Sequence, residues 1–309
     1  MRVLLTIIFY SFYLLFPLII FLFLVLWRQK EKSIELIFLI IFFLFLLWAR
    51  FAEPHILRVK KYNFFTSSTL NEEEREKKSL KIVVFSDLHV GVFRQPRKIE
   101  RVVNKVNKLK PDLVLIPGDF VYYSRVEDLE EQLSALAKLE APAVAVLGNH
   151  DYGKKKKDLS RNISSVLEAK GVLMLDNKIK QLFIKNQKIE IIGLADIWAA
   201  EPDYSILQET SADADLSLIL AHNPDTAYKI LQEEGIEAHY DLMISGHTHA
   251  GQIRFPFLYK HLIPSRYGFD QGFYKVSGRD VFVSGGIGNS ALPLRLFNFP
   301  EISLINIDF

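Results

Sequence analysis

The residues best suited to chemistry are histidines that stand beside carboxylates or amides, directly after short apolar runs. Five of the eight histidines in the 309-residue chain are placed in this way. With one Gly-Asp pair they form five motifs, in chain order Ser86-Asp87-Leu88-His89, Gly118-Asp119, Gly148-Asn149-His150-Asp151, Ala221-His222-Asn223-Pro224 and Gly246-His247-Thr248-His249. Any one of them alone is more typical of a turn. Five in succession predict one site assembled from distant segments.

The donor types in these motifs indicate a particular chemistry. Carboxylate and amide oxygens are combined with imidazole nitrogens and with no thiolate, because the chain contains no cysteine. Such ligands suit manganese, iron, zinc or magnesium. Two ions about 3.5–4 Å apart are a common device for hydrolysing phosphate esters. The residues therefore predict hydrolysis of a phosphoester or a pyrophosphate, and the lack of cysteine excludes disulfides and thiolate catalysis.

The segments around the motifs predict an α/β domain. Apolar runs typical of strands occupy residues 81–86, 112–117, 143–147, 190–194, 216–221, 241–245 and 281–284. Helical periodicity occupies residues 97–109, 127–139, 159–169 and 225–234. Ligand sites in α/β sheets lie at the carboxyl ends of the strands. Each motif follows a predicted strand, so all five can reach one crevice.

The motif series resembles that of the calcineurin-like metallophosphoesterases, from about residue 81 to the end of the chain. The resemblance implies a four-layer α/β sandwich of two mixed β-sheets flanked by helices. It also implies a dinuclear centre in which a metal-bridging hydroxide attacks phosphorus. One ion is expected to bind Asp87, His89, Asp119 and His249, and the other Asp119, Asn149, His222 and His247. Asp119 would then bridge the two ions.

The same resemblance assigns the catalytic roles. His150 is expected to contact the phosphoryl oxygens and to protonate or stabilise the leaving group, and Asp151 is expected to orient its ring. Two divalent ions are implied, with manganese as the first expectation and zinc, iron or magnesium as alternatives. The affinity order of these metals does not decide among them, since supply and geometry do so in cells.

Further motifs resemble the membrane-associated bacterial branch of this family, which includes small phosphodiesterases and the UDP-2,3-diacylglucosamine pyrophosphatases of lipid A synthesis. They are Gly251-Gln252-Ile253-Arg254, Gly286-Ile287-Gly288-Asn289 and Leu292-Pro293-Leu294-Arg295. Asn289 and Arg295 are candidate substrate-binding residues, the latter because a guanidinium fork suits a phosphate. The alternative is that both shape a loop under the metal site.

The first fifty residues predict a membrane anchor, residues 1–52. A first helix is expected at 3–27, whose 25 uncharged residues exceed the roughly 20 that span a bilayer. A second helix is expected at 34–51; its shorter apolar run, 36–49, either spans the membrane or lies at the interface. A juxtamembrane linker, 53–79, and the metallophosphoesterase domain, 80–309, are expected to follow.

The net charge and its distribution limit the expected partners and the orientation in the membrane. If both helices cross, the positive-inside rule favours a catalytic domain on the cytoplasmic face of the inner cell membrane; if only the first crosses, the rule places the domain outside. The net charge is only +2, so no nucleic-acid partner is expected. The expected partners are the lipid bilayer and an amphiphilic or nucleotide-linked phosphate substrate.

Together these features predict a membrane-anchored phosphodiester or pyrophosphate hydrolase. UDP-2,3-diacylglucosamine is the specific candidate, because an anchor raises the encounter rate only with a substrate that is also at the bilayer. The alternative is a general phosphodiesterase or phosphatase that acts on small or cell-envelope substrates. A scaffold module is disfavoured because every ligand position is filled. A pore is disfavoured because one or two spans without an intramembrane charge offer a solute no path.

Overall fold

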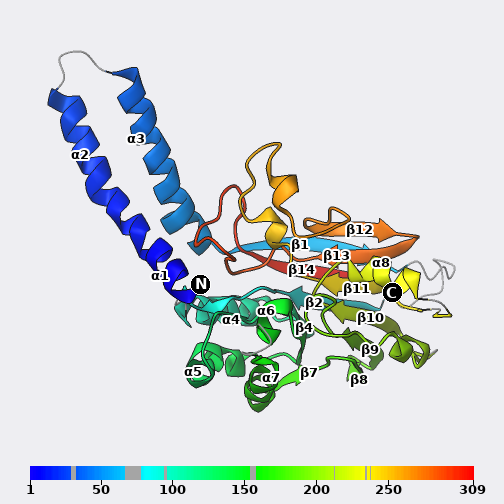
Figure 1. Ribbon diagram of the computed structural model, residues 1–309. Helices are drawn as coiled ribbons and strands as arrows, with labels where there is room; N and C mark the ends of the chain where they lie inside the picture. The colour runs from blue at the N-terminus through cyan, green and yellow to red at the C-terminus, as the bar shows by residue number, and fades with distance from the viewer. Residues whose placement is uncertain are drawn as a thin grey trace.

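The computed structural model describes residues 1–28, 33–66, 78–93, 96–153, 158–211, 213–233, 235–236 and 238–309. Residues 67–77 of the predicted linker lie outside the described residues. The described chain has two parts, an N-terminal helical hairpin and an α/β domain of two facing sheets (Figure 1).

The hairpin consists of two long apolar helices that run side by side and project away from the domain (Figure 1). The first is continuous through α1 Arg2–Ser11, η1 Phe12–Leu14 and α2 Leu15–Arg28, and the second through α3 Ile34–Leu47, η2 Trp48–Ala52 and η3 Glu53–His55. At 27 and 22 residues, with mean hydropathies of 2.6 and 2.4, both are candidate membrane spans by length and composition.

The first sheet has six strands in the order β1-β14-β2-β4-β6-β7. β2, β4, β6 and β7 are parallel, β14 is antiparallel to β2, and β1 is parallel to β14. The bounds are β1 Arg58–Phe65, β14 Glu301–Asp308, β2 Ser79–Val84, β4 Leu113–Pro117, β6 Ala143–Val146 and β7 Val172–Met174. Its outer face packs against α4 Pro96–Leu109, α5 Leu129–Leu133 and α7 Ser160–Ala169.

The second sheet also has six strands, in the order β12-β13-β11-β10-β9-β8. Its four inner strands are parallel, and β8 and β12 are antiparallel edges. The bounds are β12 Gly272–Val276, β13 Arg279–Val283, β11 Leu242–Ser245, β10 Leu216–Ala221, β9 Gln187–Leu194 and β8 Lys178–Ile184. Its outer face packs against η6 Tyr204–Gln208 and α8 Thr226–Gln232.

Strand alternation builds the core between the sheets. In β2, Ile82 and Val84 enter the shared core of the two sheets, whereas Val83 and the following Phe85 face the helices. Successive side chains of a strand point to opposite faces, so a fully apolar strand buries both. Leu218 and Leu220 of β10 meet the first sheet in the same way. The predicted α/β fold with mixed sheets is confirmed, in the order helix, sheet, sheet, helix.

Several elements differ from the predictions. The predicted linker 53–79 contains β1, whose eight residues pair in register with β14. The exposed Lys60 and Lys61 fit this strand, because an edge strand keeps a solvent-facing row that tolerates charge. The predicted helix 127–139 is divided into η4 Val126–Asp128, α5 and η5 Ser134–Lys138. The short pair β3 Val90–Gly91 and β5 Val121–Tyr122 was not predicted.

Candidate dinuclear metal centre

The five sequence motifs meet where the inner strands of both sheets end. They follow β2, β4, β6, β10 and β11 at their carboxyl ends, and α6 Asn149–Tyr152 begins within the third motif. Five of the predicted ligands have a positive φ between 48° and 72°: Asp87, His89, Asp119, His247 and His249. Each such residue costs about 1 kcal/mol or more in backbone strain. Strain at that many neighbouring polar residues is typical of a functional site.

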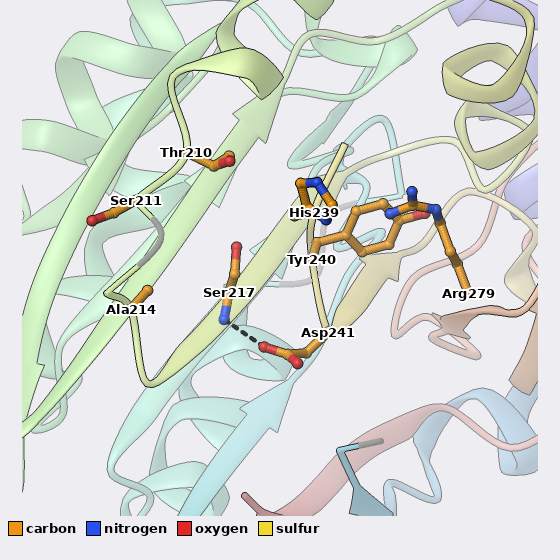
Figure 2. A pocket seen from close by; sticks show the side chains of 8 residues that line it. All are labelled: Thr210, Ser211, Ala214, Ser217, His239, Tyr240, Asp241 and Arg279. Carbon is orange, nitrogen blue, oxygen red and sulfur yellow. Dashed lines mark hydrogen bonds between the residues drawn. The ribbon is translucent and has the colours of Figure 1, made fainter. Parts of the chain in front are cut away.

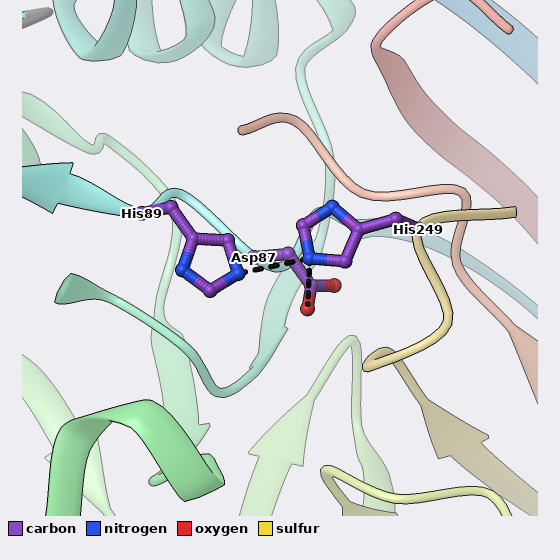
Figure 3. A group of neighbouring side chains, drawn as sticks. All are labelled: Asp87, His89 and His249. Atoms are coloured by element: carbon purple, nitrogen blue, oxygen red, sulfur yellow. Dashed lines mark hydrogen bonds and ion pairs between the residues drawn. The ribbon is translucent and has the colours of Figure 1, made fainter. Parts of the chain in front are cut away.

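The first cluster contains Asp87, His89 and His249, whose ligand atoms all lie within 4.8 Å of one another (Figure 3). The Nε2 atoms of His89 and His249 are 2.8 Å apart. The Nε2 atom of His249 lies 3.4 Å from Oδ1 of Asp87. All three side chains are buried.

The second cluster contains Asp119, His222 and His247, with the same spacing of ligand atoms. Nε2 of His222 lies 3.3 Å from Oδ2 of Asp119, 3.2 Å from Oδ1 of Asn149 and 3.1 Å from Nδ1 of His247. Nδ1 of His222 donates to the carbonyl of Pro117 at 2.8 Å. That bond fixes the ring and directs Nε2 toward the cluster.

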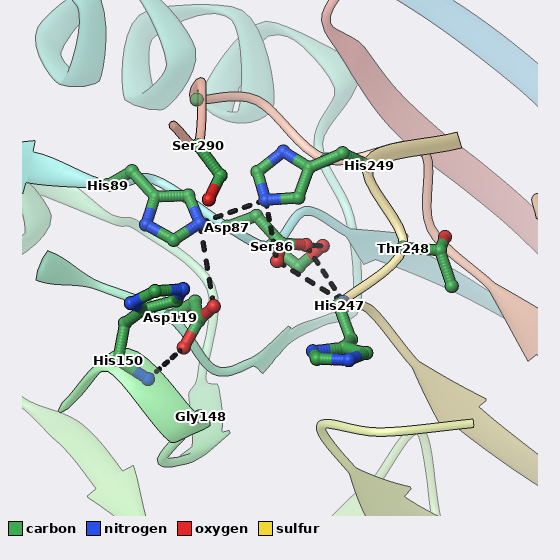
Figure 4. Close-up of polar contacts among 12 residues, drawn as sticks. Ser86, Asp87, His89, Asp119, Gly148, His150, His247, Thr248, His249 and Ser290 are labelled. Carbon is green, nitrogen blue, oxygen red and sulfur yellow. Dashed lines mark hydrogen bonds and ion pairs between the residues drawn. The ribbon is translucent and has the colours of Figure 1, made fainter. Parts of the chain in front are cut away.

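Asp119 lies between the two clusters. Its Oδ2 is 3.4 Å from Nε2 of His89 in the first cluster and 3.3 Å from Nε2 of His222 in the second. Its Oδ1 accepts a hydrogen bond from the backbone N–H of His150 at 2.9 Å (Figure 4). One carboxylate thus faces both groups, which is the arrangement expected of a bridging ligand.

Two glycines allow the loops to approach this closely. A Cβ on Gly118, whose φ is +78°, would lie 2.6 Å from the backbone nitrogen of Gly148 and 2.8 Å from Nδ1 of His222. A Cβ on Gly148 would lie 2.3 Å from Oδ1 of Asp119. Glycine is therefore required at both positions, since any side chain would separate the ligands.

The electrostatics of the centre fit cations. Burial lowers the pKa of His89 and of His247 to about 3, so both imidazoles are neutral at pH 7 and offer a lone pair. At His222 the carboxylates of Asp119 and Asp87 outweigh burial and raise the pKa well above its ordinary value. The site therefore favours positive charge between its carboxylates. The two buried His/Asp clusters fit a dinuclear metal centre.

His150 and Asp151 lie beside the clusters but do not contact each other as predicted. The ring of His150 is 5.1 Å from that of His89 and lines the adjoining pocket. The buried carboxylate of Asp151 instead accepts hydrogen bonds from the backbone N–H groups of Val121 and Gly148, at 3.0 and 2.9 Å. Asp151 thus ties two ligand loops together, and no hydrogen bond between its carboxylate and the His150 ring is found among the described residues.

The structure gives Arg295 a different role from the predicted one. Its guanidinium is fully buried and donates to the carbonyls of Gly285, Gly286 and Gly288 at 2.7–3.2 Å. These bonds hold the C-terminal loop against the ligand loop, where the N–H of Gly288 donates to the carbonyl of Asp87 at 2.6 Å. The alternative of a loop-shaping residue therefore holds for Arg295. Asn289 is buried in the same loop, and its amide has no hydrogen-bond partner among the described residues.

Three residues near the centre were not predicted. Tyr122 places its ring 4.8 Å from that of His150, and Trp198 places its ring 4.3 Å from that of His247. Asp196 is buried behind them, and burial raises the pKa of its carboxyl. Asp196 follows the predicted strand 190–194, so its strand-end position was a signal available in the sequence. The aromatic residues had none.

A pocket of about 380 Å³ opens over the centre. Its lining combines metal-ligand candidates and other polar residues with apolar side chains, namely Trp198, Ile253, Leu262, Pro264, Ala291 and Leu292. A mostly apolar lining with a few polar groups is typical of ligand-binding pockets.

A second pocket, of about 430 Å³, lies at the opposite ends of the second sheet's strands (Figure 2). Several of its polar groups have partners within the fold: the N–H of Ser217 donates to Asp241 at 2.8 Å, and Arg279 donates to the carbonyl of Ala238 and covers the ring of Tyr240. His239 lines this pocket, far from the strand ends that carry the metal ligands. The polar contacts of this second pocket hold neighbouring loops together.

Comparison with known proteins agrees with the geometry. A family model described as calcineurin-like phosphoesterase matches residues 80–251. The uncharacterized metallophosphoesterase YkuE of Bacillus subtilis is 30% identical over 84% of this chain and 88% of its own length. Phosphodiesterase YaeI of Escherichia coli is 31% identical over 74% and 82%. UDP-2,3-diacylglucosamine pyrophosphatase LpxG of Chlamydia trachomatis is 28% identical over 83% and 84%.

Motifs, geometry and relatives lead to the same conclusion. Two clusters of buried His and Asp side chains lie at the strand ends where the family model matches. The chain belongs to the calcineurin-like phosphoesterase family and is a metal-dependent phosphoester hydrolase.

Proposed function

We propose that this protein is a membrane-anchored, dinuclear metallophosphoesterase that cleaves a phosphodiester or pyrophosphate in an amphiphilic substrate. The observation that supports the proposal is the contact between the hairpin and Tyr122, a residue beside the metal centre. Leu5 and Phe9 of α1 pack against Phe93 and Tyr122, and the Tyr122 ring lies 5.2 Å from that of His89. A helix that enters a bilayer therefore places the catalytic pocket at the membrane surface.

In the proposed centre, Asp87, His89 and His249 hold one ion, His222, His247 and Asn149 hold the other, and Asp119 bridges them. Oxygen and imidazole ligands without sulfur suit manganese, with zinc, iron and magnesium as alternatives. The bound ions would supply an activated water and charge stabilisation at the phosphoryl oxygens. Arg295 and Asp151 act by positioning the loops that carry these ligands.

His150 is proposed as the group that donates a proton to the leaving oxygen. It is partly exposed, lines the pocket and lies outside both ligand clusters, so its imidazole is free to donate to a phosphate ester. Its backbone N–H is fixed by Asp119, and its ring contacts those of Tyr122 and His89 edge to face. General acid help of this kind contributes typically 10²–10⁴-fold.

UDP-2,3-diacylglucosamine is the proposed substrate. It joins a pyrophosphate to acyl chains, which matches a pocket lined both by candidate metal ligands and by apolar side chains. LpxG, whose name states this activity, is similar to the chain over most of both lengths. The second candidate is a general phosphodiesterase for small or cell-envelope substrates, and the similarity to phosphodiesterase YaeI favours it.

The proposed location is the cytoplasmic face of the inner membrane. If both hairpin helices cross, the N-terminus and the catalytic domain share a side. That side carries Arg2, Arg50, Arg58, Lys60 and Lys61, against three cations in the loop between the helices. The positive-inside rule then favours the cytoplasm for the domain.

Turnover of two substrates by detergent-purified protein tests the proposal. We expect manganese-dependent release of UMP from UDP-2,3-diacylglucosamine, which Asp119→Asn abolishes and His150→Ala strongly lowers. Hydrolysis of bis(p-nitrophenyl) phosphate alone would discard the lipid substrate and keep the phosphodiesterase. Absence of turnover with all four metals would contradict both candidates.

A further inference from the structure

A run of apolar side chains between β11 and β12 is exposed without a covering element in the described structure. Phe255, Phe257, Leu258 and Leu262 have 50, 92, 60 and 64% of their surfaces exposed, and we name these four residues the apolar lip. Large contiguous apolar patches on a protein surface mark contacts with partners or membranes. Most of the other exposed large apolar side chains after residue 57 are scattered singly, such as Phe183 on β8.

Hydrogen bonds of Arg254 and a short helical turn hold the segment that carries the lip in place. Arg254 donates to the carboxylate of Asp270 and the hydroxyl of Tyr259, each at 2.9 Å, and its backbone N–H donates to the carbonyl of Leu296 at 2.8 Å. Within the lip, η8 Tyr259–Leu262 forms one helical turn. The segment is therefore held in a defined shape that keeps Phe257 and Leu258 outward.

The lip is continuous with the base of the hairpin. Ile253, directly before it, packs in one cluster with Leu294, Leu296 and Ala49 of the second helix. Phe297 extends this surface and places its ring 5.6 Å from that of Phe45. In Figure 1 the orange segment that carries the lip rises from the domain on the side from which the hairpin emerges. Hairpin and lip thus face the same surroundings.

The lip also borders the catalytic pocket. Leu262 and Ile253 line that pocket, together with Leu292 of the C-terminal loop. Lys260 and His261, both exposed, stand on the same helical turn as Leu262. Apolar side chains flanked by basic ones are typical of segments that lie in the headgroup region of a membrane.

We propose that the apolar lip inserts into the membrane interface beside the hairpin, so that the catalytic pocket opens directly toward lipid. This inference rests on the proposed membrane anchoring and specifies how the substrate reaches the site. Acyl chains of the substrate stay in contact with the bilayer at Leu262 and Leu292, while its phosphate reaches the metal ligands. A second copy of the chain or another protein is disfavoured as the occupant, because lipid already surrounds the adjoining hairpin.

Site-specific labelling can test the insertion, because the chain has no cysteine. Phe257→Cys is labelled with an environment-sensitive fluorophore, and the full chain is reconstituted in phosphatidylethanolamine–phosphatidylglycerol vesicles that contain nitroxide lipid. Phe21→Cys, in the hairpin, serves as the positive control. Phe183→Cys serves as the matched exposed control, since Phe183 is 77% exposed on the edge strand β8.

Quenching by the nitroxide lipid at positions 257 and 21 but not at 183 is the expected result. Quenching at 21 alone would overturn the inference and leave the anchoring intact. Absence of quenching at 21 would overturn the anchoring and this inference with it. A label at 257 that is shielded from both lipid and water, in a dimeric particle, would identify a second copy as the occupant and would also overturn the inference.

Kinetics provide a second, independent measurement. Phe257→Ser should lower the turnover of vesicle-borne UDP-2,3-diacylglucosamine about tenfold relative to that of bis(p-nitrophenyl) phosphate, because one buried aromatic contact with lipid is lost. Phe183→Ser should leave this ratio unchanged. An equal ratio for both variants would contradict the role of the lip in substrate access. If the lipid nucleotide is no substrate at all, the proposed substrate fails, and the quenching result still decides whether the lip inserts.

Discussion

Replacement of Arg295 by methionine tests whether this residue holds the fold or binds substrate. Arg295 is the largest fully buried side chain among the described residues, and its donors reach the carbonyls of Gly285, Gly286, Gly288 and Asn298. Burial lowers the pKa of the guanidinium to about 10, so it stays charged at pH 7. Methionine has a similar length but donates to none of these carbonyls, of which only that of Gly286 keeps another donor among the described residues, the N–H of Glu301.

The expected loss of stability follows from those bonds. Removing one partner of a buried charged network costs about 3–5 kcal/mol, less than the sum of its separate bonds because they share one group. For a domain of this size each kcal/mol corresponds to about 2–4 °C, so Tm should fall by about 6–20 °C. Arg295→Lys keeps the charge but not the fork, so we expect it to recover only part of this loss.

The assay combines thermal unfolding, metal content and steady-state kinetics below both transitions. A positioning role predicts a lower Tm and weaker metal retention, while KM for bis(p-nitrophenyl) phosphate stays within about twofold. A Tm equal to that of the parent protein, together with a KM raised about tenfold or more, would refute this reasoning. Arg295 would then bind substrate, as its sequence motif suggested.

Three further predictions concern the centre and its surroundings. Asp119→Asn should lower the content of both ions, measured by elemental analysis, because this carboxylate faces both clusters; retention of two ions would contradict its bridging role. His150→Ala should keep both ions and the parent Tm but lose about 10²–10⁴-fold in kcat; full activity would remove His150 from catalysis. The third prediction concerns Asp176, because burial raises the pKa of its carboxyl to about 6. The folded state therefore binds the proton of this group more tightly than the unfolded state does, and the free energy of unfolding falls as pH rises from about 4 to 6. Asp176→Asn keeps an acceptor for the N–H of Leu147. Urea unfolding above pH 6 should show this variant to be about 2–3 kcal/mol more stable than the parent. Equal stability at pH 5 and at pH 8 for both proteins would contradict this prediction.

Much of the site could be predicted from the sequence, because each ligand is a local consequence of a strand and the turn that follows it. Asp87, Asp119 and His222 come at the ends of largely apolar runs, and parallel strands bring such positions to one edge. The two candidate membrane helices are also predicted by local sequence, since hydropathy over about 20 residues is enough to identify them. The predicted ligand set therefore lies together in the structure, in the two groups that the family resemblance implied.

Only the tertiary structure decided what surrounds those ligands. β1 pairs with β14 across some 240 residues of chain, and no pattern within β1 reveals that partner. The roles of Asp151 and Arg295 depend on backbone groups of other loops, because a buried carboxylate or guanidinium serves whichever donors or carbonyls the fold brings to it. The exposure of Phe257 is likewise absent from any sequence pattern, since an apolar residue is core or surface only by virtue of what packs against it.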